Sequence, residues 1–118
     1  MSNEDVKLII VEGKSDKDKV EKLINDHVEI VCTNGTIGIE KLEGLIETYD
    51  MENRDVYILV DEDKAGKKLR KQLSKELPHA SHIYVDKAFR EVAATPEAAL
   101  ATALISSHIM IHPDYLSR

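Results

Sequence analysis

Short apolar runs alternate along this chain with longer stretches in which apolar residues recur every three or four positions. The runs at 7–12 and 55–60 hold four or five consecutive apolar residues, which is typical of strands buried on both faces of a parallel sheet. Less regular runs at 28–33 and 82–85 predict two more strands. The pattern therefore predicts four strands, spaced widely enough to be joined by helices.

The stretches between the strands have helical periodicity. They predict helices from about Ser15 onward and over 39–49, 65–77 and 96–106. Asp18 follows Ser15 by three residues and resembles an imperfect capping box. Thr95-Pro96-Glu97 predicts a helix start, with a capping residue, a proline at the first helical position and an acid near the positive end of the helix dipole.

This alternation predicts an α/β fold that spans residues 1–118 as a single domain. We expect a Rossmann-like, four-stranded parallel sheet, in the order 2-1-3-4, with helices on both faces. The stretch 86–94 is the longest without an assigned element. The tail 108–118 is too apolar to be a free tail, and its apolar side chains suggest a surface that needs cover.

Carboxylates follow the two most apolar strands. Glu12 ends the first, and Asp61 and Asp63 come directly after the third. Residues at i and i+2 point to the same side of an extended chain, so we expect both aspartates to aim at one point while Glu62 faces away. Oxygen ligands without Cys or His suit Mg²⁺, with Mn²⁺ as an alternative. Glu12 is the candidate to complete the metal site or to move a proton as a catalytic residue.

Charge along the chain is uneven. The formal net charge is −6, which argues against non-specific binding of nucleic acid. However, most cations follow the two acidic segments, either as solvated helix faces or as phosphate contacts. The candidates for phosphate contact are Lys14, Lys67, Lys68 and Arg70. Arg70 is adjacent to the core candidate Leu69, so we expect Arg70 to point away from the packed face.

The dipeptide Asn34-Gly35 follows the second predicted strand. Its simplest interpretation is a turn. The alternative is that its backbone contacts a phosphate beside the metal.

Two spaced motifs resemble the signatures of the Toprim domain family. They are Glu12-Gly13-x-x-Asp16 after the first strand and Asp61-x-Asp63-x-x-Gly66 after the third. The order and length of the elements match that family over nearly the whole chain. Closest in similarity are the small bacterial Toprim proteins and the ribonuclease that matures 5S ribosomal RNA, on the segments 11–16, 33–36 and 95–98.

The resemblance assigns roles to the motif residues. It implies that Glu12 is a general acid or base or a metal ligand, and that Asp61 and Asp63 coordinate Mg²⁺. Gly13 and Gly66 would allow a phosphate or another part of the chain to approach closely. Asp16 would support the first loop.

The implied function is Mg²⁺-dependent action on nucleic-acid phosphodiesters, with nuclease-like hydrolysis as the leading hypothesis. From these 118 residues we expect neither the second, RNA-binding domain of the ribonuclease nor a topoisomerase or primase flanking domain. The alternative is therefore a non-catalytic nucleic-acid-binding or ribosome-associated module with a weak metal site. Expected partners are RNA or DNA, together with another protein or a second copy of the chain.

Two other site types fit the residues less well. Gly13-Lys14-Ser15 resembles the end of a P-loop, but Leu8 occupies the position of the first P-loop glycine. A phospho-acceptor receiver domain would carry an acidic pair after its first strand, where this chain has only Glu12.

Composition also bears on location. No apolar stretch approaches the roughly 20 residues of a membrane-spanning helix, and the acidic start at 1–5 argues against a signal peptide. The single cysteine, Cys32, has no intrachain partner for a disulfide and is expected to be a small core residue. We therefore expect a cytoplasmic protein with no membrane partner.

Overall fold

The computed structural model describes residues 6–115. The predictions about the acidic start at 1–5 and about the last three residues of the tail, 116–118, lie outside this range. The strands are β1 (Lys7–Val11), β2 (Val28–Cys32), β3 (Val56–Leu59) and β4 (Ser81–Ile83). The α-helices are α1 (Lys14–Leu23), α2 (Ile39–Thr48), α3 (Lys64–Glu76) and α4 (Glu97–Ser106), and two short 3₁₀ helices, η2 and η3, cover Met51–Asn53 and Pro113–Tyr115. Each element lies within a few residues of its predicted position.

The four strands form one parallel sheet in the order β2-β1-β3-β4, which confirms the predicted topology. In its centre Ile9 of β1 pairs with Ile30 of β2 and with Tyr57 of β3. Because the first and third strands are neighbours, the residues that follow them come out side by side at the carboxyl edge of the sheet.

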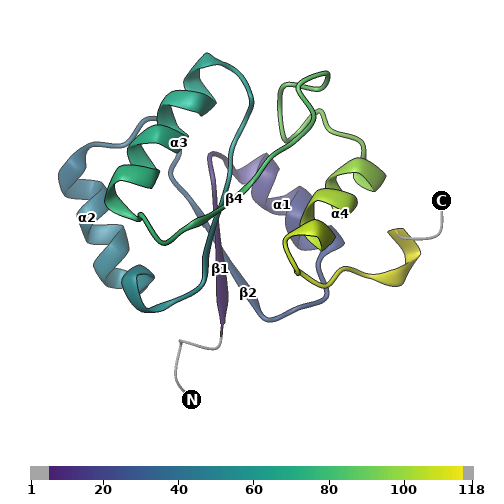
Figure 1. Ribbon diagram of the computed structural model, residues 1–118, viewed down its shortest axis with the longest axis horizontal. Coiled ribbons are helices and arrows are strands. Elements are labelled where there is room, and N and C mark those ends of the chain that lie inside the picture. The colour runs from purple at the N-terminus through teal and green to yellow at the C-terminus, as the bar shows by residue number, and fades with distance from the viewer. Residues whose placement is uncertain (1–5, 116–118) are drawn as a thin grey trace.

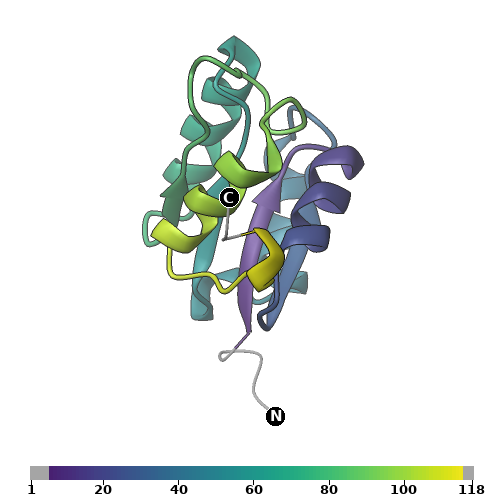
Figure 2. The same ribbon diagram turned by 90° about the vertical axis from the view of Figure 1, so that its right-hand side faces the viewer.

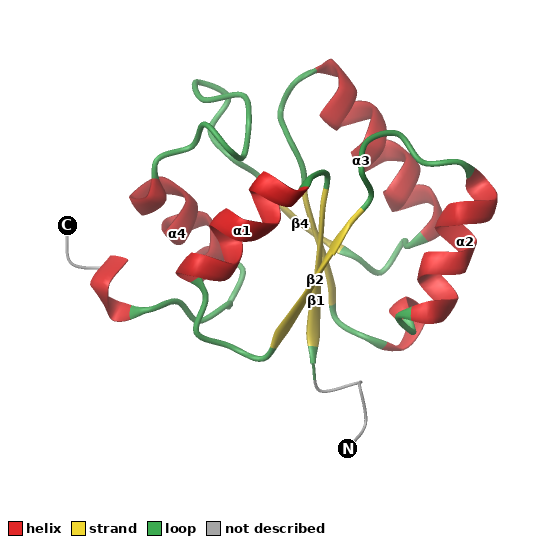
Figure 3. Ribbon diagram, turned by 180° about the vertical axis from the view of Figure 1, so that it is seen from behind, coloured by secondary structure: helices red, strands yellow, loops and turns green. Residues whose placement is uncertain are grey.

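Helices cover both faces of the sheet, as Figures 1 and 3 show: α2 and α3 lie on one side, and α1 and α4 on the other. Alternate strand residues feed two separate cores. Ile9 and Val11 pack in the cluster with α1 and α4, whereas Leu8 and Ile10 pack in the cluster with α2 and α3. Burying each such side chain contributes about 1.5–3 kcal/mol, and this two-sided burial explains the continuous apolar runs.

Two predicted helix starts were wrong in detail. The N-cap of α1 is Gly13, and the carboxylate that turns back to the Gly13 N–H belongs to Asp16 rather than Asp18. The N-cap of α4 is Pro96, not Thr95. Thr95 is buried, and its hydroxyl donates a hydrogen bond to the Glu91 carbonyl instead of capping the helix.

The tail after α4 packs back on the molecule, as its apolar composition predicted. Ile109 and Ile111 are buried, and Ile111 forms an antiparallel bridge with Ile24. The His112 N–H donates to the carbonyl of Leu23. No helix in the described part of the chain is long and apolar enough to cross a membrane.

The predicted orientation of Arg70 was wrong. Its side chain is buried, and its guanidinium group donates hydrogen bonds to the carbonyls of Ile58 and Ile83. Although Arg70 follows Leu69 in α3, its side chain is long enough to reach the carboxyl ends of β3 and β4. The backbone carbonyls there provide the partners that a buried guanidinium group requires.

Candidate metal and phosphate site

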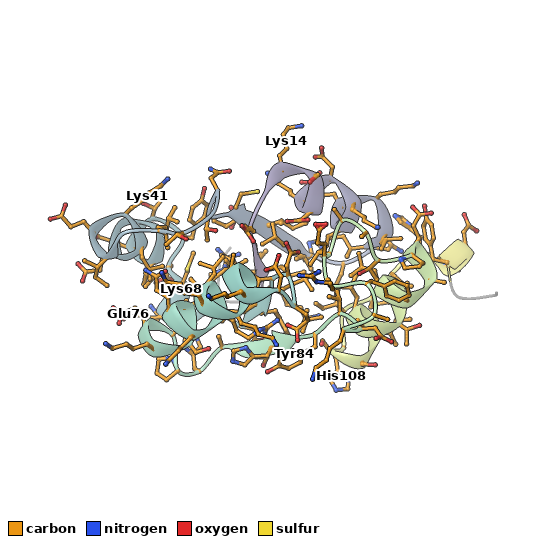
Figure 4. The ribbon with its side chains drawn as sticks, turned by 90° about the horizontal axis from the view of Figure 1, so that it is seen from above. Lys14, Lys41, Lys68, Glu76, Tyr84 and His108 are labelled. Carbon is orange, nitrogen blue, oxygen red and sulfur yellow. The ribbon has the colours of Figure 1, made fainter. Side chains whose placement is uncertain are left out.

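The acidic residues of the two motifs meet at the carboxyl edge of the sheet, which Figure 4 views from above. Glu12 follows β1 directly, and Asp61 follows the extended end of β3. The charges of Asp61, Asp63 and Asp16 all act on Glu12 strongly enough to raise its pKa, so the four carboxylates lie near one another. The neighbouring positions of β1 and β3 bring them together, as the sheet order predicted.

Glu12 has an unsatisfied oxygen. Its Oε1 atom is buried and has no hydrogen-bond partner among the described residues. Burial raises the pKa of Glu12 above its usual value, and repulsion from Asp61 and then Asp63 raises the pKa further. A buried carboxylate oxygen without a partner normally costs free energy, so this atom is available for a cation or a proton.

The two aspartates each use one oxygen to hold the backbone. Asp61 Oδ1 accepts the Val92 N–H at 2.8 Å, and Asp63 Oδ1 accepts the Gly66 N–H at 2.8 Å as the N-cap of α3. The second oxygen of each carboxylate is then available for a ligand. Burial raises the pKa of Asp61, and the Val92 hydrogen bond opposes that rise.

Asp16 lies in the first turn of α1 and is buried. Its Oδ2 atom accepts the Gly13 N–H at 3.1 Å and so shapes the turn that follows Glu12. Burial raises the pKa of Asp16, the Gly13 hydrogen bond lowers it, and the charge of Glu91 raises it again. Asp16 therefore supports the first loop geometrically, as expected from its place in the motif.

Gly66 is required by the packing of α3 against the strand end. A β-carbon at this position would lie 2.6 Å from the carbonyl carbon of Asp61, and closer still to its oxygen. Gly13 is different, because the nearest atom to a β-carbon there would be Asp16 Oδ2 at 3.8 Å. The absence of a side chain at Gly66 thus allows the backbone of Asp61 to approach α3 closely.

The turn after β2 lies beside the acidic residues. Asn34 and Gly35 both have positive φ, and the Asn34 N–H donates to the Glu12 carbonyl at 2.7 Å. This backbone N–H is consequently committed to the sheet edge, and the chain bends at Gly35. Contact of the turn with a phosphate stays a prediction.

The three lysines predicted to contact phosphate, Lys14, Lys67 and Lys68, are all exposed. Lys14 lies at the start of α1 and pairs with Asp18, with 87% of its side chain exposed. Lys67 lies in the first turns of α3, close in sequence to Asp63. Figure 4 shows Lys14 projecting outward from α1.

A metal ion fits the chemistry of this site, although the carboxylates do not form a ready three-ligand group. Among residues 6–115, no three His, Cys, Asp or Glu side chains are arranged so that they could hold an ion together. The predicted sharing of one ion by Glu12, Asp61 and Asp63 therefore stays a prediction. Mg²⁺ commonly uses only one or two carboxylates and completes its octahedron with waters and substrate phosphates. The unpartnered Glu12 oxygen and the all-oxygen donor set suit such an ion.

The loop between β4 and α4 rises above the carboxyl edge, as Figures 1 and 2 show. Asp61 holds this loop through Val92, and the Glu62 N–H donates to the Arg90 carbonyl. Lys19 of α1 reaches the carbonyls of Ala93 and Thr95 in the same loop. The loop is therefore fastened to the acidic residues that it borders.

Residues 7–88 match the family model described as Toprim domain. The chain belongs to the Toprim domain family. The two motifs thus correctly identified the family, and the sheet order placed both signatures at one edge.

Several curated proteins are similar to this chain in sequence. The Bacillus subtilis protein called "Uncharacterized protein YusF" is 47% identical over 112 residues, which cover 95% of this chain and 75% of that protein. Ribonuclease M5 of Mycoplasma genitalium is 33% identical over 79 residues, covering 67% of this chain and 43% of that protein. Ribonuclease M5 of Fusobacterium nucleatum is 34% identical over 80 residues, covering 68% of this chain and 43% of that protein. The chain thus spans less than half the length of these ribonucleases.

A solved structure described as "Structure of small TOPRIM domain protein from Bacillus stearothermophilus" is similar over almost the full length. It is 48% identical, covers 96% of this chain and 94% of that one, and has a TM-score of 0.89.

Two residues of the Toprim site were not predicted from the sequence. Glu91 adds a fifth carboxylate, whose charge acts on both Asp16 and Asp61. Lys19 anchors the loop that carries Glu91. The stretch 86–94 has no periodicity that could have indicated its path, so only the fold reveals these contacts.

Proposed function

We propose that this Toprim domain binds Mg²⁺ at the carboxyl edge of its sheet and hydrolyses nucleic-acid phosphodiesters there. The observation that supports this most is the buried, unpartnered Oε1 atom of Glu12, close to the carboxylates of Asp61 and Asp63. Leaving such an oxygen unpaired among like charges is unfavourable unless a ligand supplies positive charge.

Asp61 and Asp63 would offer the ion the oxygens that do not accept backbone N–H groups, and waters and phosphate oxygens would complete its coordination. When bound, Mg²⁺ neutralises phosphate charge and polarises the phosphoryl group. Glu12 is the group that could also carry a proton, because burial and the neighbouring acids raise its pKa above the usual value. The Val92 and Gly66 hydrogen bonds fix the two aspartates in place.

The relatives support action on nucleic acid. Two of them are ribonucleases, and the match covers less than half of each. That this chain shares their substrate and activity is therefore part of the proposal. RNA is the first substrate to test, and DNA the second.

The test compares the wild-type protein with Asp61→Asn on structured RNA and DNA, with and without Mg²⁺. Asparagine removes the charge but keeps an oxygen for the Val92 N–H, so the loop stays fastened. We expect Mg²⁺-dependent cleavage by the wild type and a loss of at least about 100-fold in the variant, the scale on which a key electrostatic group contributes. Cleavage that Asp61→Asn retains would exclude this site as the catalyst.

Asp55→Asn is the matched control. Asp55 is exposed, and it lies at the opposite end of the strand that leads to Asp61. The Asp55→Asn variant undergoes the same change of charge as Asp61→Asn and should cleave nucleic acid like the wild type. If both variants lose activity equally, net charge rather than the site controls the reaction.

A non-catalytic binding module is the second candidate. It is favoured by the absence of a three-ligand group within residues 6–115 and by the short match to the ribonucleases. Calorimetric titration with Mg²⁺ and Mn²⁺ separates the readings. Ion binding that is lost in Asp63→Ala, without cleavage of either nucleic acid, would favour the binding module. RNA or a protein that co-purifies with the chain would then identify its partner.

A further inference from the structure

An exposed aromatic ring stands beside the acidic site. Tyr84 follows β4, the edge strand of the sheet, and 56% of the residue is exposed. Figure 4 shows Tyr84 next to α3, on the opposite side of the molecule from Lys14. An exposed tyrosine usually reflects a solvated surface, but this one is held in place by specific contacts.

Arg70 fixes the ring from beneath. Its guanidinium carbon lies 4.2 Å from the centre of the Tyr84 ring, within the range of a cation–π contact. The same guanidinium group is held by the carbonyls of Ile58 and Ile83, at 3.2 and 2.8 Å, and by Glu62 at 3.8 Å. Because Arg70 is itself buried and fixed, the tyrosine lies on a rigid base.

His82 completes this base. Its ring is stacked with that of Tyr84, with centroids 6.0 Å apart and planes 23° apart. Arginine can only donate, so the 2.9 Å contact from Arg70 to His82 Nδ1 requires an unprotonated Nδ1. The proton of the neutral ring is then on Nε2, where it donates to Ser74 Oγ at 3.3 Å.

A cavity of about 420 Å³ lies over this base. Its walls include Tyr84, His82 and Arg70, together with two exposed lysines of α3, Lys67 and Lys71. Glu62 also lines it, and Glu62 stands between the two aspartates of the site in sequence. The cavity therefore reaches the segment that carries the two aspartates, on the side of the strand end to which Glu62 and Arg70 belong, and it is lined by cations and an aromatic ring.

We infer that this cavity binds an unpaired nucleobase, stacked on Tyr84, with the adjacent phosphates held by Lys67 and Lys71. The inference rests on the proposed action on nucleic acid and names the form of the substrate: a single-stranded segment. Aromatic rings recognise any unstacked base through its π-face, whereas bases inside a duplex are not accessible for stacking. A rigid ring beside two exposed cations suits this ligand, because the ring can stack on the base while the lysines neutralise the phosphates.

The chain offers a clean spectroscopic test, because it contains no tryptophan. Tyr84→Trp places a single indole in the cavity, and a base that stacks on it should quench its fluorescence. The probe is a single-stranded RNA 12-mer and a DNA 12-mer of the same sequence, each also offered as a duplex, in EDTA. Excluding metal makes the measurement independent of cleavage, so failed hydrolysis and failed stacking are distinguishable.

We expect both single strands to quench the reporter and the duplexes to do so at least 10-fold more weakly. Met110→Trp is the matched control, since Met110 is 64% exposed and lies in the tail segment after α4. Its fluorescence should not respond. Equal quenching by duplex and single strand, or equal quenching of both reporters, would overturn the inference. So would a Tyr84→Trp signal that depends on protein concentration alone, which would assign this surface to a second copy of the chain.

Affinity variants supply the second measurement, made by fluorescence anisotropy of the labelled single strand. Tyr84→Ala should weaken binding by about 5- to 100-fold, whereas Tyr84→Phe, which keeps the ring, should bind like the wild type. Lys71→Ala should weaken binding and flatten its salt dependence by about one phosphate contact, and Lys41→Ala on α2 should do neither. Full affinity in Tyr84→Ala would refute the stacking, whatever the lysines do.

Discussion

Gly66 provides the sharpest test of how the fold builds the acidic site. It lies in the first turn of α3, where its N–H donates to the N-cap carboxylate of Asp63 and its α-carbon faces the backbone of Asp61. In Gly66→Ala, the new β-carbon would meet the Asp61 carbonyl carbon at 2.6 Å. Nonbonded carbon atoms prefer about 3.5–4.0 Å, so helix and strand end must separate by about 1 Å.

The magnitude follows from two opposing terms. Overpacking of a closely packed site costs about 1–3 kcal/mol, and a clash with backbone rather than a flexible side chain belongs at the upper end of that range. Replacing a helical glycine with alanine gains up to about 1 kcal/mol through helix propensity. The expected net effect on Gly66→Ala is a loss of about 2 kcal/mol in the free energy of unfolding.

Gly44→Ala is the matched control for this prediction. Gly44 lies within α2, and a β-carbon there would meet no atom within 4 Å. The same substitution should therefore stabilise the protein by about 0.5–1 kcal/mol. Urea unfolding of both variants, followed by circular dichroism, should give midpoints that move in opposite directions with unchanged slopes.

A second readout concerns the site itself. Separation of α3 from Asp61 should shift both aspartates, so Gly66→Ala should also bind Mg²⁺ more weakly in calorimetry, while Gly44→Ala binds normally. The reasoning is refuted if Gly66→Ala is as stable as Gly44→Ala, because the close approach would then not constrain the fold.

Three further predictions concern charge and burial. Asp61→Asn should raise the free energy of unfolding in EDTA by about 0.5–1 kcal/mol, because one of several mutually repelling carboxylates is removed while the acceptor for the Val92 N–H is kept. Mg²⁺ should raise the melting temperature of the wild type but not of this variant. Arg70→Met should cost about 2–4 kcal/mol in urea unfolding, because two buried backbone carbonyls lose their donor, and Arg70→Lys should not restore that loss. Burial, and then the charge of Arg70, lower the pKa of His82 below its usual value of 6.5, so the folded state binds fewer protons than the unfolded state. Stability should therefore be lost as the pH falls below about 6.5. His82→Gln should lose less stability than the wild type between pH 7.5 and 5.5, and equal losses would contradict the assignment.

The sequence was sufficient for the sheet because local and tertiary preferences agree there. Strands such as β1 are buried on both faces, so each carries a continuous apolar run that can be read directly. The motif spacing then placed Glu12 and Asp61 at one edge, since both follow neighbouring strands. Periodicity could not reveal side chains whose environment is set by tertiary contacts.

Arg70 illustrates that limit. Adjacent helix positions are only about 100° apart, so a residue next to a core leucine can still reach the interior if its side chain is long and finds acceptors there. Those acceptors are carbonyls at the ends of β3 and β4, far apart in sequence. Glu91 was not predicted for a related reason. The path of its loop is set by hydrogen bonds to Asp61 and Lys19 and not by a repeating sequence pattern.

Under the proposed function, the charges around the site predict that metal and substrate bind cooperatively. Burial raises the pKa values of Glu12 and Asp61, and the charges of Asp16 and Asp63 raise both further. The chain as a whole carries a net charge of −6. A phosphodiester approaching this edge alone would meet like charge, and the few cations beside the cavity lie to one side of it. A divalent ion removes that repulsion and offers open coordination positions to phosphate oxygens. By linkage, the nucleic acid must then raise the affinity for Mg²⁺ by the same factor as Mg²⁺ raises the affinity for nucleic acid.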